Sequence, residues 1–220
     1  MVLQDRAKAT RAAVIAGAAA VFEEQGYGST SLTQVAERAQ VTKGAMYFHY
    51  PSKEALARAV IAEQHRLAEA EGQRVLAKGL PPLESMILIC ATFGRQLLEE
   101  PVVRAGTRLT FEATSFGPPV REPYVDWIAT IEELAAQARA AHQLRASVDA
   151  EAFAHYLVAS FTGVQMVSCV LTERQDVMQR IEQMWDIMLP GILHEDLLEQ
   201  AKKLSALIPQ AVLEPAPVTG

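Results

Sequence analysis

Apolar residues recur at helical spacing along almost the whole chain, and strand-like alternation of apolar and polar residues is nearly absent. The first predicted helix spans about residues 5–25, where the apolar stripe stops at Gly26. That stripe comprises Val14, Ile15, Ala18, Val21 and Phe22. The pattern therefore predicts an all-α protein.

Proline, glycine and capping residues divide the rest of the chain into further helices. We expect long helices over residues 52–78, 83–100, 102–114, 123–143, 149–171 and 176–189, and a last one ending near residue 208. Pro190-Gly191 predicts a break or kink before this last helix. The Pro-rich tail, residues 209–220, is predicted to be disordered.

Residues 31–50 carry the pattern of two short helices joined by a tight turn. Ser31 and Gln34 have the spacing of a reciprocal capping box, and Thr42 is a good N-cap for the second helix. Met46 is expected to point into the core beside Val41. The arrangement indicates a helix-turn-helix, which lays its second helix in the DNA major groove.

The start of the second helix has the chemistry of a phosphate-binding site. Small residues follow Lys43 and allow close approach, while the free N–H groups and the helix dipole favour an anion. The alternative is a pair of packed surface helices without a ligand. The residues expected to contact double-stranded DNA are Thr33, Thr42, Lys43, Gly44, Ala45, Tyr47, His49 and Lys53.

The helix predicted after Asp149 is apolar almost all round, so it must be buried on all sides. Its apolar residues are Phe153, Leu157, Val158, Phe161, Val164, Met166, Val167 and Val170, and the next helix adds Val177, Ile181, Met184, Trp185 and Met188. We expect a homodimer that forms a four-helix interface through helices near 150–171 and 176–193. The alternative is an ordinary core within one chain.

Charge is distributed unevenly along the 220 residues. The net charge is −6, which argues against a general nucleic-acid binder. Residues 1–58 contain seven Lys/Arg and five Asp/Glu, a net charge of +2, whereas the remainder carries −8. This distribution confines the expected DNA contact to the N-terminal end.

Nothing in the sequence indicates an enzyme, a metal or a cofactor. The two cysteines and five histidines show no metal-ligand spacing, and no nucleophile elbow or Gly-rich phosphate loop is present. The rival hypothesis, a hydrolytic enzyme, lacks its nucleophile and base. The N-terminus is polar and no run of about 18 apolar residues occurs, so we expect a soluble, cytoplasmic protein without a membrane segment.

The N-terminal motifs also resemble a known family. Gly26-Tyr27, Thr30-Ser31-Leu32, Val35-Ala36, the run Val41–Tyr50 and Ser52-Lys53-Glu54-Ala55-Leu56 are similar to the N-terminal domain of TetR-type repressors. Gln40 departs from the family, which usually has glycine at this turn. A left-handed backbone conformation costs a residue other than glycine about 1 kcal/mol, so we expect a slightly less favourable or differently shaped turn that keeps the motif.

The domain division expected on this basis has three parts. Residues 1–51 form a helix-turn-helix DNA-binding domain, and residues 52–208 form a helical-bundle domain for effector binding and dimerisation, with residues 52–78 as the connecting helix. Residues 209–220 form the tail. A dimer of this kind binds a palindromic operator.

A second resemblance covers the body of the chain. Pro101–Leu109, the run Pro123-Tyr124-Val125-Asp126-Trp127, residues 152–165 and the Trp185 region are similar to butyrolactone-type autoregulator receptors of antibiotic-producing bacteria. The resemblance implies a repressor of secondary-metabolite genes that a small lipophilic γ-butyrolactone-like, furan or butenolide signal releases from its operator. The alternative within the family is a repressor that responds to an antibiotic or another hydrophobic drug.

Trp127 matches the pocket tryptophan of these receptors, and a flat indole suits a lactone or furan ring. Trp127 as a core residue, Thr162 bonded to its own helix and His65 facing solvent are the alternatives. The residues expected to bind the effector are Gln64, His65, Thr110, Tyr124, Trp127 and Thr162.

Overall fold

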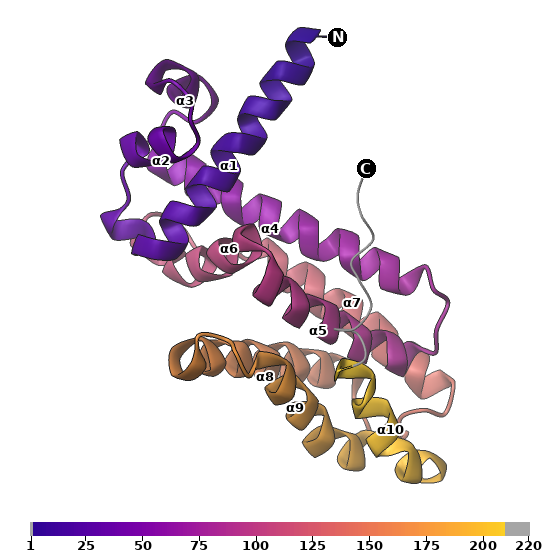
Figure 1. The fold of residues 1–220 in the computed structure, drawn as a ribbon. Helices are drawn as coiled ribbons and strands as arrows, with labels where there is room; N and C mark the ends of the chain where they lie inside the picture. The colour runs from indigo at the N-terminus through magenta and orange to yellow at the C-terminus, as the bar shows by residue number, and fades with distance from the viewer. Residues whose placement is uncertain (1, 210–220) are drawn as a thin grey trace. The chain divides into compact units, whose positions relative to one another are not determined.

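The computed structural model describes residues 2–209, and all regular structure in that range is helical (Figure 1). The all-α prediction is confirmed. Apart from Pro209, the predicted disordered tail lies outside the described residues. The helices form two compact units, here called the head unit and the body unit.

The head unit comprises residues 1–69 and 99–120. It contains α1 (Val2–Ser29), α2 (Leu32–Arg38), α3 (Lys43–His49), the first part of α4 (Lys53–Leu76), α6 (Pro101–Glu112) and the 3-10 helix η1 (Ala113–Ser115). The helical path of α1 breaks at Gly26, whose φ of 72° and ψ of 174° are not helical, as the sequence predicted. The buried core of this unit includes Phe22, Val35, Met46, Leu56 and Leu109.

Charged side chains join α6 to the end of α1. Arg104 forms an ion pair with Glu23, although 81 residues separate them in sequence. Arg108 donates from Nη1 to the Glu23 carbonyl at 2.8 Å, and the Tyr27 N–H donates to Glu112 Oε2 at 2.8 Å. Packing therefore groups α6 with the helix-turn-helix, and the functional boundary expected after residue 51 remains a prediction.

The body unit comprises residues 70–98 and 121–220. Its helices are α5 (Pro82–Glu99), α7 (Glu122–Ala140), α8 (Ala150–Thr172), α9 (Val177–Ile192), the 3-10 helix η2 (Glu195–Gln200) and α10 (Ala201–Ser205). Helix α8 packs against both α7 and α9, and α10 packs against α9 (Figure 1). The largest fully buried side chains of the unit include Trp185, Phe161, Leu83, Met86 and Ile131.

Helix α8 begins where the sequence predicts, because Asp149 Oδ1 accepts the Ala152 N–H at 2.8 Å. By length and composition α8 would also suit a membrane, but core helices of soluble proteins meet the same criteria. Phe153, Leu157 and Phe161 on α8 are buried within the chain. One face of α8 is therefore packed against other helices of the body unit.

The break predicted at Pro190-Gly191 lies two residues later, since α9 continues through Pro190 and ends at Ile192. Arg145 donates to the Pro190 carbonyl at 3.2 Å and to the Leu193 carbonyl at 2.9 Å. These bonds satisfy carbonyls at the helix end and help the helix to persist past the proline. The single helix predicted after it is instead η2 followed by the short α10.

Candidate functional site

The α2–turn–α3 segment has the geometry that its capping residues predict. The Ser31 N–H donates to Gln34 Oε1 at 2.8 Å, and the Gln34 N–H donates back to Ser31 Oγ at 3.3 Å. Thr42 Oγ1 accepts the Ala45 N–H at 3.1 Å and caps α3. Gln40 adopts the left-handed conformation with φ of 55°, so the turn keeps its shape without glycine.

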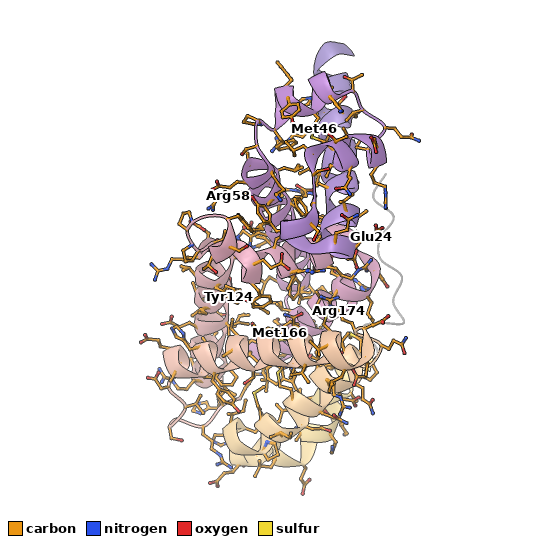
Figure 2. All side chains as sticks on the ribbon, turned by 90° about the vertical axis from the view of Figure 1, so that its left-hand side faces the viewer. Glu24, Met46, Arg58, Tyr124, Met166 and Arg174 are labelled. Carbon is orange, nitrogen blue, oxygen red and sulfur yellow. The ribbon has the colours of Figure 1, made fainter. Side chains whose placement is uncertain are left out.

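Helix α3 is anchored on one side and exposed on the other. Met46 is fully buried in the head core and holds α3 in place (Figure 2). Thr42, Lys43 and Gly44 at its start are exposed, and Tyr47 keeps 53% of its surface accessible. Thr33, Ala45 and His49 are half-buried.

Phe48 was not among the residues predicted to contact DNA, yet its side chain is 84% exposed on α3. It packs edge-on against His49 with 5.3 Å between ring centroids. The signal in the sequence was an aromatic residue two positions after Met46, because residues two apart on a helix do not share a face. Phe48 therefore extends the exposed surface of α3.

Lys53 has a different environment from Lys43. Its ammonium donates to the Tyr27 carbonyl at 2.9 Å and to the Gly28 carbonyl at 3.2 Å, and lies 4.4 Å from the centre of the Tyr27 ring. These contacts tie α4 to the turn after Gly26. Its contact with DNA stays a prediction, and Lys53 has a structural role in addition.

Several other basic residues of the head unit are neutralised by acids. Arg38 forms two hydrogen bonds of 2.9 Å with Glu24, which lower the pKa of that carboxyl below its ordinary value. Arg58, labelled with Glu24 in Figure 2, forms an ion pair with Glu54 at 3.0 Å. Lys43 makes no ion pair with the described side chains, so its charge is available to a phosphate.

Three aromatic rings meet in the body unit around Trp127. The Trp127 ring lies edge-on to Phe93 at 5.4 Å and to Phe161 at 5.1 Å between centroids, and Phe93 and Phe161 are 5.6 Å apart. Phe161 is fully buried, whereas Phe93 and Trp127 are half-buried. The cluster brings together α5, α7 and α8.

A pair of polar side chains, Tyr124 and Thr162, connects two of these three helices, α7 and α8. The Tyr124 hydroxyl interacts with the Thr162 side chain, and Tyr124 precedes Trp127 by three residues on one face of α7. Burial raises the pKa of Tyr124, and the Thr162 hydroxyl opposes that rise. Of the six predicted effector residues, Tyr124, Trp127 and Thr162 thus share one neighbourhood.

The other three predicted effector residues belong to the head unit. Gln64 is 5% exposed and packs on Gly106, where an added Cβ would lie 2.3 Å from the Gln64 Cβ. Thr110 donates its hydroxyl to the Gly106 carbonyl at 2.8 Å, so it is bonded to its own helix. His65 is half-buried and has interaction partners. Their effector roles stay predictions.

Gln165 is a buried polar residue that the sequence reasoning missed. It is 3% exposed and lies one turn after Phe161 on the buried face of α8. An amide in the middle of an apolar helix was the available signal.

An exposed apolar surface runs along α8 and α9. Tyr156, Val167, Val170 and Leu171 on α8 and Ile187 on α9 expose between 57% and 82% of their side chains. A groove between the two helices is lined by residues of both, including Ser160, Gly163, Val167 and Gln183. We call these residues the α8/α9 face.

The expectation for α9 needs a correction at the level of residues. Five apolar side chains of α9 were assigned to the dimer interface, but all are at most 7% exposed within the single chain: Val177, Ile181, Met184, Trp185 and Met188. Ile181 contacts α5 beside Gly94, which shows where this stripe packs. Ile187 is the α9 residue that the periodicity did not single out.

Two family profiles match the chain. Residues 14–60 match the bacterial regulatory proteins of the tetR family, and residues 80–194 match the tetracyclin repressor-like C-terminal domain. The first range includes α2 and α3, and the second includes the Trp127 cluster and α8.

Similar proteins cover most of the chain. The A-factor receptor protein of Streptomyces griseus is 34% identical over 202 residues, which are 92% of this chain and 70% of that protein. A structure described as the molecular basis for control of antibiotic production by bacterial hormones is 39% identical, covers 84% of this chain and 97% of its own, and has a TM-score of 0.78. CprB from Streptomyces coelicolor, solved with its biological operator sequence, is 31% identical over 93% of this chain and 98% of its own, with a TM-score of 0.78.

Proposed function

Because the chain belongs to the TetR family of bacterial transcriptional regulators, we propose that it represses secondary-metabolite genes from a palindromic operator and leaves that operator when a small lipophilic autoregulator binds. The observation that carries this proposal is the A-factor receptor match, which extends over the DNA-binding head and the body together. A match limited to the head would support DNA binding alone.

The head supports the DNA-binding part of the proposal. The capped N-terminus of α3 exposes Thr42, Lys43 and Gly44, and no acid neutralises Lys43 among the described residues. A free cation beside a helix N-terminus favours phosphate. Phosphate contacts position α3, while the exposed side chains of Tyr47 and its neighbours reach the groove.

The body supports the effector part. The half-buried indole of Trp127 offers a flat apolar surface, and Tyr124 with Thr162 places two hydroxyl groups nearby. A few polar groups in aromatic surroundings orient a ring-containing oxygenated ligand. We therefore propose a γ-butyrolactone-like, furan or butenolide effector, with Tyr124, Trp127 and Thr162 as contacts.

The α8/α9 face supports the homodimer. Its exposed apolar side chains lie on the two helices that the sequence predicted to pair, and a two-fold axis would cover the same surface on both subunits. Contiguous exposed apolar surface of this kind marks an interaction site. We propose that the dimer acts in the cytoplasm, where the operator is, and that it carries out no turnover of its effector.

Operator binding followed by effector release tests the proposal. Footprinting on DNA upstream of the protein's own gene should show two half-sites related by a two-fold axis, with centres about 34–36 Å apart or a multiple of that distance. Synthetic γ-butyrolactones, furans and butenolides with alkyl side chains are then added to the complex. Release by one of these classes supports the proposal, and release only by hydrophobic antibiotics would assign the protein to the drug-responsive alternative.

A further inference from the structure

The N-terminal part of α1 carries basic side chains that the helix-turn-helix motif does not include. Lys8 and Arg11 are both exposed, and their spacing of three residues places them on one face of α1. Residues 5–11 contain Arg6, Lys8 and Arg11 against Asp5 alone, a net charge of +2. Lys8 and Arg11 therefore form a local basic surface on a protein whose net charge is −6.

Arg11 lies beside the end of α3. Its Nε donates to the Tyr50 hydroxyl at 3.2 Å, and Tyr50 is the C-cap of α3. Helices α1 and α3 are also in direct contact (Figure 1). The basic face of α1 is thus continuous with the DNA-reading helix.

The basic residues of the head unit differ in whether acids neutralise them. Arg38, Arg58 and Arg66 each pair with a glutamate at 3.0 Å or less. Glu63, whose pKa is lowered first by Arg66 and to a smaller extent by Arg11, already makes two hydrogen bonds with Arg66. Neither Lys8 nor Arg11 forms an ion pair with the described side chains.

A cation that forms no ion pair with the described side chains lies at each end of α3. Lys43 begins the helix, and Arg11 contacts the residue that ends it. Seven residues at 1.5 Å rise give α3 a length of about 10 Å, close to the roughly 12 Å width of the major groove. Cations at both ends of a helix in that groove are placed to meet phosphates on both of its sides.

We propose that Lys8 and Arg11 of α1 form a second phosphate-binding surface for operator DNA, at the end of α3 opposite to Lys43. The surface adds affinity for DNA of any sequence and fixes the register of α3 in the groove. It rests on the proposed operator binding and assigns residues outside the helix-turn-helix to it.

Salt dependence distinguishes this surface from a structural role. Each phosphate contact contributes about 0.9 to the slope of log affinity against log salt, and a dimer loses two contacts when one cation is removed. Lys8→Ala and Arg11→Ala should each flatten the slope by about 1.8 and weaken operator and unrelated duplex DNA by the same factor. The control Glu24→Gln/Arg38→Gln removes a neutralised pair and should leave the slope unchanged.

Tyr50→Phe separates the charge of Arg11 from its hydrogen bond. It removes the hydroxyl that accepts from Arg11 but keeps the cation, so the slope should stay as in the wild type. If Tyr50→Phe reproduces the loss seen with Arg11→Ala, Arg11 only positions α3 and the proposal is wrong. An unchanged slope with Lys8→Ala, which has no such hydrogen bond, would overturn it as well. If no variant and not even the wild-type protein binds palindromic DNA, the proposed function itself fails.

Discussion

Gln40 shows how one residue departs from its family and keeps the local structure. Its φ of 55° is the left-handed conformation that glycine adopts without strain, yet the turn forms and the Val41 N–H still donates to the Ala36 carbonyl at 3.0 Å. From the sequence we expected a slightly less favourable or differently shaped turn at Gln40, and the structure retains the turn with a left-handed φ. The strain is the cost of this departure from the family pattern.

Gln40→Gly should therefore stabilise the protein. The gain is at most about 1 kcal/mol, since relief of the left-handed strain is partly offset by the greater freedom of glycine in the unfolded chain. Gln40→Ala is the matched control and should bring no gain, because it keeps the Cβ. Urea unfolding of the three proteins measures the difference, and an alanine variant as stable as the glycine variant would show that the Cβ is not the source of strain.

Asp176 gives a pH dependence to the stability of the turn between α8 and α9. Hydrogen bonds from Ser168 and Thr172 and the ion pair with Arg180 hold the pKa of Asp176 well below its ordinary value of 3.8. A lowered folded-state pKa contributes stability that is fully present above the ordinary pKa and is lost as the pH falls through the lowered one.

Asp176→Asn should accordingly lower stability at neutral pH and flatten the loss of stability below about pH 4, since asparagine does not titrate. Thermal unfolding from neutral to acid pH measures both effects. An acid limb as steep as that of the wild type would show that other carboxyls control it.

At the scale of elements, the exposed α8/α9 face predicts how a charge placed on it would affect the dimer. Val170 is 82% exposed in the single chain, so a glutamate there is harmless to a monomer. In a dimer that covers this face, the charge would be buried without a partner, and burial of an unpaired charge is costly. Val170→Glu should give a folded monomer with weakened operator affinity.

Sedimentation and circular dichroism together check this outcome. Glu151→Gln at the start of the same helix is an exposed control that should leave the dimer intact. A Val170→Glu protein that remains a stable dimer would place the interface on another surface.

The limits of prediction from sequence also appear at the scale of elements. Caps and stops at Gly26, Ser31, Thr42 and Asp149 depend on nearby residues, and all four were predicted correctly. The continuation of α9 past Pro190 is supported by Arg145, which is 45 residues away in sequence and supplies hydrogen bonds that no local rule anticipates.

The candidate site divides in the same way. Periodicity identified the apolar stripe of α9 but not its neighbour, so Trp185 and its stripe were assigned to a partner chain although they pack within their own. Trp127 was found through the family resemblance, whereas the contact of its ring with Phe93 and Phe161 depends on three separate helices. The buried amide of Gln165 required the structure.

At the scale of the whole molecule, the proposed function requires that the operator and the effector affect one another's binding. Helix α4 is one continuous helix from Lys53 to Leu76 and begins directly after the helix-turn-helix. Helix α6 holds the end of α1 through Arg104, Arg108 and Glu112. Helix α4 runs from the head unit into the sequence of the body unit, and α6 lies between α5 and α7 in sequence.

Antagonism between operator and effector is what the proposed function requires, and a coupled titration measures it. Labelled operator duplex is titrated with protein in the presence and absence of the γ-butyrolactone, furan or butenolide that releases it, and the affinity of the same compound is measured with and without saturating operator. We expect each ligand to weaken the binding of the other by the same factor, as linkage requires, and Trp127→Ala to retain operator affinity but to be no longer released. A compound from these classes that binds the protein tightly and leaves operator affinity unchanged would show that the protein is not a repressor released by such an effector.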